Sequence, residues 1–380
     1  MTTETIVIVA AITGIHLVCA HAMARRAAHP RLAARVTARS SRPSRATRVQ
    51  GSARQRAGAV AAVAGDVNLR TTRPLSRGAA EETMTSVQAT VGGRNPVAIE
   101  VIPNAGALGA EIRAGDLRTL SEAAFQHILA AWYRHAVVLF RGQSLDDGDL
   151  IAFSRRFGDL DWAPVQENGR RFVEGMPEIY IVSNVKVNGE AIGSLGDGEA
   201  VWHTDMSYLD RPPKASMLYA LEIPDIGGNT SFCSMYAIYE ALPAALKARI
   251  AGLKIKHDGT YNSGGYLRQG VTATDDPRAS PGAVHPLVCR HPESGRRMLY
   301  LGRRRNAYID GLSLADSEAL LDELWSYVKR PEFAWEHVWR VGDLVLWDNR
   351  CTMHRRDAFD PAQRRIMHRT QVKGEAAPAG

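Results

Sequence analysis

The apolar residues of this chain recur at helix and strand spacings from about residue 98 onward, and they predict many short strands with a few helices. Within residues 121–135, Ala124, Ile128 and Trp132 share one helix face, and Ser121 can cap the first turn. Similar spacing, with start and stop signals, predicts three further helices over residues 144–158, 234–251 and 312–329.

Apolar runs of strand length lie between these helices. They predict strands over residues 98–102, 136–140, 178–185, 215–221, 229–232 and 364–370, a hairpin across 284–302, and two paired strands over 334–340 and 343–347. Strands and helices do not alternate regularly, so the pattern favours an antiparallel barrel or sandwich with helices outside. The expected fold is therefore mainly β with additional helices.

The string VWHTD at residues 201–205 carries the first chemical signal. If it lies on a strand, the side chains of His203 and Asp205 point to the same face and Thr204 points away. Two histidines and one carboxylate on one side of a metal are typical of non-haem iron oxygenases, whereas zinc more often takes cysteine or a third histidine. The short pattern alone also fits an ordinary exposed pair, so a third ligand is required.

His354 is the strongest candidate for the third ligand because it follows the predicted strand over residues 343–347. Five other histidines compete with it, and we expect them to be surface or structural residues: His257, His285, His291, His337 and His368. The four cysteines form no C-x-x-C pair, which indicates neither a metal nor a redox motif. Cys351 lies near His354 in the sequence, and we expect it to be a core residue.

A basic run over residues 364–370 carries the second signal. On a strand, Arg365, Met367 and Arg369 share one face, and Arg364, Ile366 and His368 share the other. Two guanidinium groups on one face can bind two carboxylates or one dianion, because the planar guanidinium fork matches a carboxylate. The alternative is a solvated edge strand whose arginines only keep it soluble.

These motifs together resemble the Fe(II)/2-oxoglutarate-dependent dioxygenases of the taurine dioxygenase and 2,4-dichlorophenoxyacetate (2,4-D) dioxygenase family. The resemblance extends over about residues 99–373, with the motifs in the family's order and spacing. It rests on the strings WHTD (202–205), GGNTSFCSMYAIYEALP (227–243), HPLVCRHPESGRR (285–297), GDLVLWDNRCTMHR (342–355) and RRIMHRT (364–370).

The resemblance implies a double-stranded β-helix, or jelly roll, with flanking helices. It implies Fe(II), 2-oxoglutarate as cosubstrate and O₂, with three iron ligands: His203, Asp205 and His354. Arg365 matches the arginine that pairs with the distal carboxylate of 2-oxoglutarate, and Thr230 matches the threonine that supports this carboxylate. Arg369 matches the arginine that holds the anionic group of the primary substrate.

For the substrate, the resemblance favours hydroxylation of a small organic anion next to a heteroatom. The taurine enzymes carry a histidine and a tyrosine at positions that match Ala163 and Gln166, which counts against taurine. The string SNVKVNGE (183–190) and others look more like the 2,4-D enzymes and favour an aryloxyalkanoate. A taurine, alkylsulfonate or alkyl sulfate dioxygenase stays open, as do a zinc hydrolase and a non-catalytic jelly roll that binds anions.

Two loops are expected to border this site. Residues 188–200, rich in glycine and acids, lead directly into the VWHTD string and form a candidate lid. Residues 261–281 are rich in glycine, and we expect them to be mobile and to border the substrate.

The charge separates the chain into two parts. Residues 1–83 hold thirteen arginines and four acids, a net charge of +9, so the remainder carries −2 of the total +7. We interpret residues 1–83 as a disordered Arg/Ala-rich extension, a transit peptide or a region before a true start at Met84, and residues 84–380 as the dioxygenase domain. We expect a cytoplasmic protein that binds a small anion but no nucleic acid or membrane. The family is often oligomeric, so a homo-oligomer is open.

Overall fold

The computed structural model describes residues 99–274 and 276–380. The extension predicted over residues 1–83 and the boundary at Met84 lie outside the described residues. Within the described part, no helix has the length and apolar character needed to cross a membrane.

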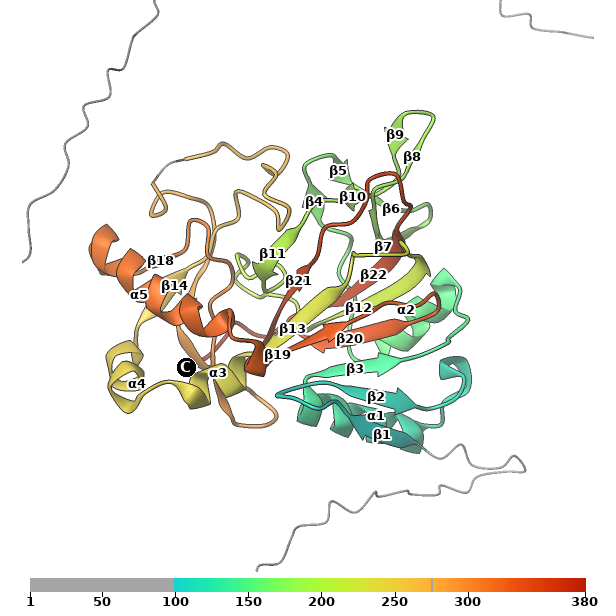
Figure 1. Ribbon diagram of the computed structural model, residues 1–380, viewed down its shortest axis with the longest axis horizontal. Coiled ribbons are helices and arrows are strands. Elements are labelled where there is room, and N and C mark those ends of the chain that lie inside the picture. Colours follow the sequence, from blue (N-terminus) through green and yellow to red (C-terminus); the bar gives the residue numbers. More distant parts are fainter. Residues whose placement is uncertain (1–98, 275) are drawn as a thin grey trace, which may run out of the picture. The chain divides into compact units, whose positions relative to one another are not determined.

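A nine-stranded major sheet forms the largest layer (Figure 1). Its strand order is β1-β2-β3-β20-β12-β22-β7-β10, and β6 pairs with β7. The strands are β1 (Glu100–Pro103), β2 (Ala110–Arg113), β3 (Val137–Phe140), β6 (Phe172–Val173), β7 (Met176–Ser183), β10 (Ser194–Leu195), β12 (Ala215–Glu222), β20 (Leu344–Asp348) and β22 (Ile366–Val372). Helices α1 (Glu122–His135) and α2 (Asp147–Arg155) pack on one face of this sheet through a shared apolar cluster.

A four-stranded minor sheet, in the order β11-β21-β13-β19, faces the major sheet. Its strands are β11 (Ala200–His203), β13 (Thr230–Ser234), β19 (Ala334–His337) and β21 (Thr352–Arg356). The side chains between the two sheets form their own core, in which the Phe232 ring of β13 lies 5.5 Å from the Trp347 ring of β20. The result is the predicted two-sheet, mainly β fold, and the space between the sheets is where the site forms.

The remaining elements build a second apolar cluster beside the sheets. They are α3 (Met235–Ala241), α4 (Ala244–Ile250), α5 (Leu314–Val328), β14 (Lys254–Lys256), β15 (Val284–Pro286), β16 (Val288–Arg290), β17 (Arg297–Leu299) and β18 (Tyr308–Ile309). Short pieces complete the described part: β4 (Val165–Gln166), β5 (Gly169–Arg170), β8 (Lys186–Val187), β9 (Glu190–Ala191), and the 3-10 helices η1 (Leu117–Thr119) and η2 (Pro331–Phe333).

Helix boundaries follow capping chemistry where it is strong. The predicted N-cap Ser121 accepts a hydrogen bond from the backbone N–H of Ala124, as expected. The helix predicted from residue 144 begins instead at Asp147, because Asp146 and Asp149 form a reciprocal capping box. The single helix predicted over residues 234–251 is wrong: it breaks into α3 and α4 at Pro243, whose ring cannot continue a helix.

Two strand pairings also differ from the prediction. The segments 334–340 and 343–347 do not pair with each other; β19 pairs with β13, and β20 lies between β3 and β12. All five residues of β20 are buried, so this strand needs apolar partners on both faces, which only the centre of the major sheet supplies. Of the predicted hairpin over 284–302, β16 and β17 pair as expected, but β15 pairs with β14.

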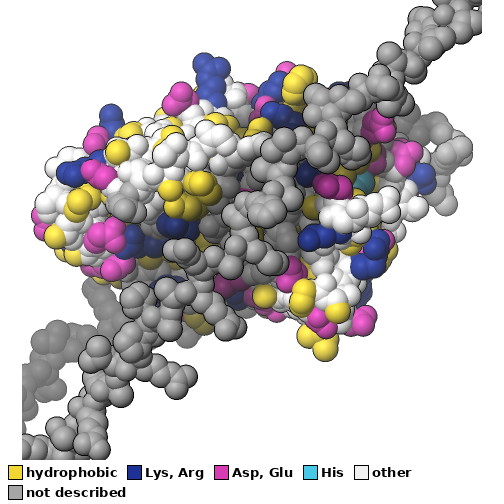
Figure 2. Space-filling view, turned by 90° about the horizontal axis from the view of Figure 1, so that it is seen from above, with side chains coloured by type: hydrophobic (Ala, Val, Ile, Leu, Met, Phe, Trp, Pro, Cys, Tyr) yellow, Lys and Arg dark blue, Asp and Glu magenta, His cyan; other side chains and the backbone are white. Residues whose placement is uncertain are grey.

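Strand β22 lies inside the major sheet, between β12 and β7. The edge-strand alternative for the basic run is therefore wrong. Arg365 and Arg369 are 1% and 6% exposed, and Met367 between them is fully buried, whereas Arg364 on the other face is exposed. The predicted alternation of faces is thus confirmed. On the surface, Figure 2 shows basic and acidic side chains interspersed among the described residues of the face in view.

Candidate active site

Three potential metal ligands meet between the two sheets. His203 at the end of β11 lies directly opposite His354 on the antiparallel strand β21, with ring centroids 4.1 Å apart. The Oδ1 of Asp205 is 3.7 Å from the Nε2 of His203 and 4.0 Å from the Nε2 of His354. All three side chains are buried, and their ligand atoms lie within 4.8 Å of one another. The grouping predicted from the sequence is the grouping that the fold produces.

The backbone reaches this grouping differently from the prediction. Strand β11 ends at His203, and Asp205 stands in the turn that follows rather than on the strand. The Thr204 hydroxyl donates to the carbonyl of Thr352, so this side chain is engaged with the neighbouring strand. His354 was predicted to lie just past the strand over residues 343–347. It lies instead on a separate strand, β21.

The surroundings of the His203 and His354 imidazoles suit metal ligands. The Nδ1 of His203 is 2.7 Å from the carbonyl oxygen of Val201, which fixes a proton there and leaves a lone pair on Nε2. Burial lowers the pKa of His354 well below its ordinary value, and the neighbouring His203 and Arg369 lower it further. Metals bind an unprotonated ring nitrogen, so the lowered pKa of His354 and the Nε2 lone pair of His203 both suit a metal ligand.

The five competing histidines contact other groups, as expected for structural residues. His257 contacts the Ser207 hydroxyl, His285 the carbonyls of Ser207 and Leu209, His291 the Asp348 carboxylate, His337 the Asp343 carboxylate and His368 the Asp147 carboxylate. Cys351 is a buried core residue, as predicted.

The Asp205 carboxylate is held from two sides. Arg369 donates from Nη1 to Oδ1 at 3.0 Å, and Ser216 donates from its hydroxyl to Oδ2 at 2.8 Å. Burial alone would raise the pKa of Asp205, but the adjacent Arg369 guanidinium holds this pKa well below its ordinary value. The carboxylate is therefore ionised at neutral pH and can bind a cation.

A chain of buried hydrogen bonds behind Asp205 was not predicted. The indole Nε1 of Trp347 donates to the Asn349 Oδ1 at 2.9 Å, and the Asn349 Nδ2 donates to the Ser216 hydroxyl at 2.9 Å. Ser216 then donates to Asp205. The WDN string is visible in the sequence, but its link to Ser216 depends on the pairing of β12 with β20, which no local pattern reveals.

We expect Ser216→Ala to weaken Fe(II) binding by about 10- to 100-fold, the range for removing a partner that orients a metal ligand. The carboxylate of Asp205 would lose its Oδ2 donor, while its contact with Arg369 would remain. Equilibrium titration with Fe(II) under anaerobic conditions measures the effect. Ser231→Ala on β13 is the matched control, because Ser231 lies on the opposite face of its strand from Thr230. Equal affinity of the two variants would contradict the role of Ser216.

A buried arginine without an acidic partner lies next to the three ligands. Arg365 is 1% exposed, and its Nε and Nη2 have no hydrogen-bond partner among the described residues. Burial, together with the nearby Arg356, lowers the pKa of Arg365 well below its ordinary value. Burying an unpaired charge is costly, so this position is suited to an anion that completes it.

Thr230 and Arg369 line the same cavity as Arg365, His203 and His354, a space of about 40 Å³. The Thr230 hydroxyl accepts a hydrogen bond from the Trp339 indole at 3.0 Å, so its own proton is free to be donated into the cavity. The residue types fit a metal ion and a carboxylate side by side: neutral nitrogens and one carboxylate for the metal, a guanidinium and a hydroxyl for the anion.

The candidate lid is tied to the site in this structure. The guanidinium of Arg356 donates to the backbone carbonyls of Leu195, Gly196 and Gly198. Leu195 also lines the inner cavity. These contacts hold residues 195–198 over the cavity, and the opening of this segment remains a prediction.

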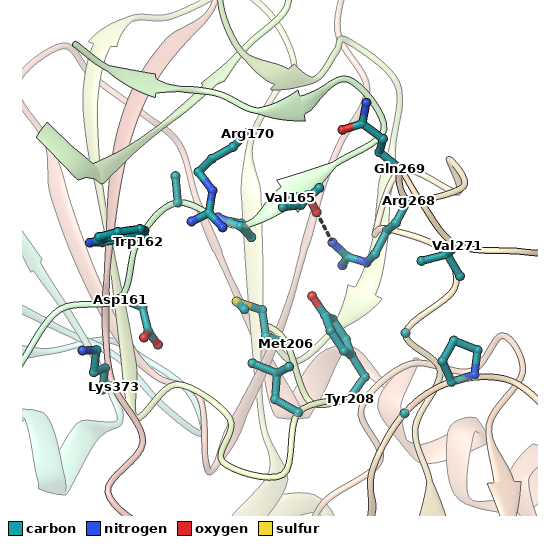
Figure 3. A pocket seen from close by; sticks show the side chains of 16 residues that line it. Asp161, Trp162, Val165, Arg170, Met206, Tyr208, Arg268, Gln269, Val271 and Lys373 are labelled. Atoms are coloured by element: carbon teal, nitrogen blue, oxygen red, sulfur yellow. Dashed lines mark hydrogen bonds between the residues drawn. The ribbon is translucent and has the colours of Figure 1, made fainter. Parts of the chain in front are cut away.

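A larger outer pocket of about 700 Å³ is lined by Met206, the residue that follows Asp205 in the chain (Figure 3). It is lined by residues within the segments 161–170, 206–209 and 259–282, together with Lys373. Residues 261–281 thus line a pocket beside the site, in agreement with the expectation that they border the substrate. Ala163 lines the pocket directly, whereas the Gln166 Oε1 accepts a hydrogen bond from Arg268. Arg268 was not among the predicted site residues.

The comparisons with known proteins agree with this geometry. Residues 100–371 match the model of the family described as "Taurine catabolism dioxygenase TauD, TfdA family". An alpha-ketoglutarate-dependent 2,4-dichlorophenoxyacetate dioxygenase from Burkholderia sp. (strain RASC) is 35% identical over 248 residues, which are 63% of this chain and 82% of the relative. An alpha-ketoglutarate-dependent sulfate ester dioxygenase from Pseudomonas putida is 33% identical over 74% of this chain and 91% of the relative.

A crystal structure of a taurine dioxygenase from Burkholderia xenovorans has the same fold. It superposes with a TM-score of 0.60 at 33% identity, covering 74% of this chain and 91% of that chain. The predicted jelly roll is thereby confirmed. Alpha-ketoglutarate is the 2-oxoglutarate inferred above, and Fe(II) is the metal typical of the family. The chain belongs to the TauD/TfdA family of alpha-ketoglutarate-dependent dioxygenases.

Proposed function

We propose that this enzyme hydroxylates a small organic anion next to a heteroatom, and that the anion is an aryloxyalkanoate of the 2,4-D kind. The observation that carries this proposal is the unpaired, buried Arg365, which shares one cavity with the ligand histidines. A protein that only bound an anion would not require His203, Asp205 and His354 beside it. A zinc hydrolase would not require an unpaired guanidinium in the same cavity as its ligand histidines.

In this proposal each residue has a defined task. His203, Asp205 and His354 hold Fe(II), and Arg365 with Thr230 holds the distal carboxylate of 2-oxoglutarate. Iron and 2-oxoglutarate, when bound, supply the oxidation by O₂, with CO₂ and succinate as the products of the cosubstrate. Arg369 contacts the substrate anion, and its bond to Asp205 keeps the metal-binding carboxylate ionised and oriented.

The outer pocket supports an aryl substrate. Apolar side chains from Trp162, Pro164, Val165 and Met206 line it, and they suit a ring better than a short hydrophilic chain. Ala163 offers no hydrogen bond, and Gln166 is already engaged by Arg268. The position-by-position argument against taurine is therefore supported by the surroundings of both residues.

A sulfonate or sulfate ester is the second candidate, because relatives of similar identity act on such compounds. A guanidinium binds sulfate and carboxylate groups by the same charged hydrogen bonds. The choice between the two substrate classes therefore depends on the shape of the outer pocket rather than on the inner arginines.

Succinate formation from 2-oxoglutarate tests the proposal. The full chain, loaded anaerobically with Fe(II), is given oxygen and one of four compounds: 2,4-D, a phenoxypropionate, hexyl sulfate or taurine. We expect 2,4-D or the phenoxypropionate to stimulate turnover most. Stimulation by hexyl sulfate or taurine alone would assign the second candidate, and the absence of iron binding and succinate under every condition would contradict the dioxygenase proposal itself.

A further inference from the structure

Arg268 is a buried arginine on the wall of the outer pocket (Figure 3). It is 8% exposed, and its Nη1 donates to the Val165 carbonyl and to the Gln166 side chain, both at 3.1 Å. Its guanidinium carbon lies 4.7 Å from the centre of the Tyr208 ring. These contacts fix the position of the guanidinium, so little side-chain freedom would be lost when an anion binds to it.

The positive charge of Arg268 is not neutralised locally. Among the described residues, no carboxylate lies within ion-pair distance of Arg268 or of Arg303, and the Nε of each is buried without a partner. Arg303 is itself 8% exposed, and its backbone forms a bridge with that of His203.

An anion in the outer pocket would give the buried Arg268 guanidinium the charged partner that it lacks among the described residues. Arg369 differs in this respect because it already donates to the Asp205 carboxylate at 3.0 Å. Arg170, the other arginine of the pocket, is exposed and lies over the Trp162 ring, where solvent screens its charge.

We propose that Arg268 binds the anionic group of the primary substrate, as a contact additional to Arg369, and thereby sets the preference of the outer pocket for anions. This inference rests on the proposed function, since it names a substrate contact of the same site. The matching substrate class is an apolar body, placed against Met206 and Val165, that carries one carboxylate or sulfate group.

Equilibrium binding separates this role from a structural one. Isothermal titration of the full chain with 2,4-D is compared with titration by its neutral amide, for wild type, Arg268→Gln, Arg268→Lys and the control Arg249→Gln, an exposed arginine of α4. We expect Arg268→Gln to weaken 2,4-D binding at least about tenfold and amide binding less than twofold. Arg268→Lys keeps the charge but loses the fork, so an intermediate loss is expected. Arg249→Gln, on α4 and outside the pocket, should match wild type.

Three results would overturn the inference. One is a change below twofold for 2,4-D in Arg268→Gln, and another is an equal loss for 2,4-D and its amide, which indicates a purely structural residue. The third is the failure of wild type to bind 2,4-D, a phenoxypropionate, hexyl sulfate and taurine alike. If thermal unfolding shows that Arg268→Gln does not fold, the contrast between 2,4-D and its amide in Arg268→Lys decides. Succinate formation by Fe(II)-loaded wild type tests the proposed function separately.

Discussion

Replacing Asp205 with asparagine is expected to lower Fe(II)-dependent succinate formation by at least about a thousandfold, since a bound metal contributes several kcal/mol to the barrier that it lowers. The substitution removes the one anionic ligand of the three and leaves the buried Arg369 guanidinium without its anionic partner, although the Asn amide oxygen can still accept a hydrogen bond. A positive charge beside two neutral imidazoles would then disfavour a cation at the same place. Iron content per chain and succinate formation, measured on the same preparation, give the result.

Asp210→Asn is the matched control, because it removes the same charge from an exposed position five residues away. The control should retain iron and turnover. If Asp205→Asn also retains both, Asp205 is not a metal ligand. If wild type binds iron but forms no succinate with any compound, the chain is better explained as an anion-binding jelly roll.

The second large effect is expected at Arg365. Arg365→Gln should raise the KM for 2-oxoglutarate by about 100- to 1000-fold, which corresponds to about 3–4 kcal/mol for loss of a buried charged partner. The guanidinium is 1% exposed and has two unpartnered nitrogens, so its contribution arises only when an anion is bound. For the same reason, the variant without 2-oxoglutarate should unfold at an equal or higher temperature than wild type. Steady-state kinetics and thermal unfolding measure the two effects.

Arg364→Gln is the control for this experiment. Arg364 is adjacent in the sequence, but it is exposed and forms an ion pair with Glu222 at 2.7 Å, which solvent screens. It should leave the KM for 2-oxoglutarate within twofold of wild type. A similar KM increase in both variants would indicate a general effect of positive charge rather than a cosubstrate contact at Arg365.

Local signals in the sequence predicted the elements well wherever they were strong. The Ser121 cap and the buried strand β3 formed as expected. Errors arose where two local signals compete: the Asp146 capping box displaced a start at residue 144, and Pro243 broke a helix that its apolar spacing favoured. Strand pairing could not be predicted for the segment 334–347, since adjacent strands in the sequence entered different sheets.

In the site, too, residues of local motifs could be predicted and contacts that depend on strand pairing could not. The triad was accessible because two of its members are two residues apart and the third belongs to a recognisable string. The support of Asp205 by Ser216 depends on how β12 pairs with its neighbours, and no short motif contains it. Arg268 was missed for a related reason: its partners Val165 and Gln166 are about one hundred residues earlier in the chain.

The inner part of this site is built on strands of the two facing sheets, whereas the outer pocket is built largely outside them. This difference bears on how such enzymes diversify. Ligand and cosubstrate residues lie on or beside strands of the two facing sheets, where a register slip of one residue would replace Arg369 with a neighbour from the opposite face. The outer pocket is built mostly from loops and from the short β4–β5 hairpin, which lies outside the two facing sheets. Insertions and exchanges in those loops can therefore accumulate without disturbing the oxidative chemistry. Grafting the segments 161–170 and 259–282 between family members should transfer substrate choice while the oxidation step is inherited unchanged.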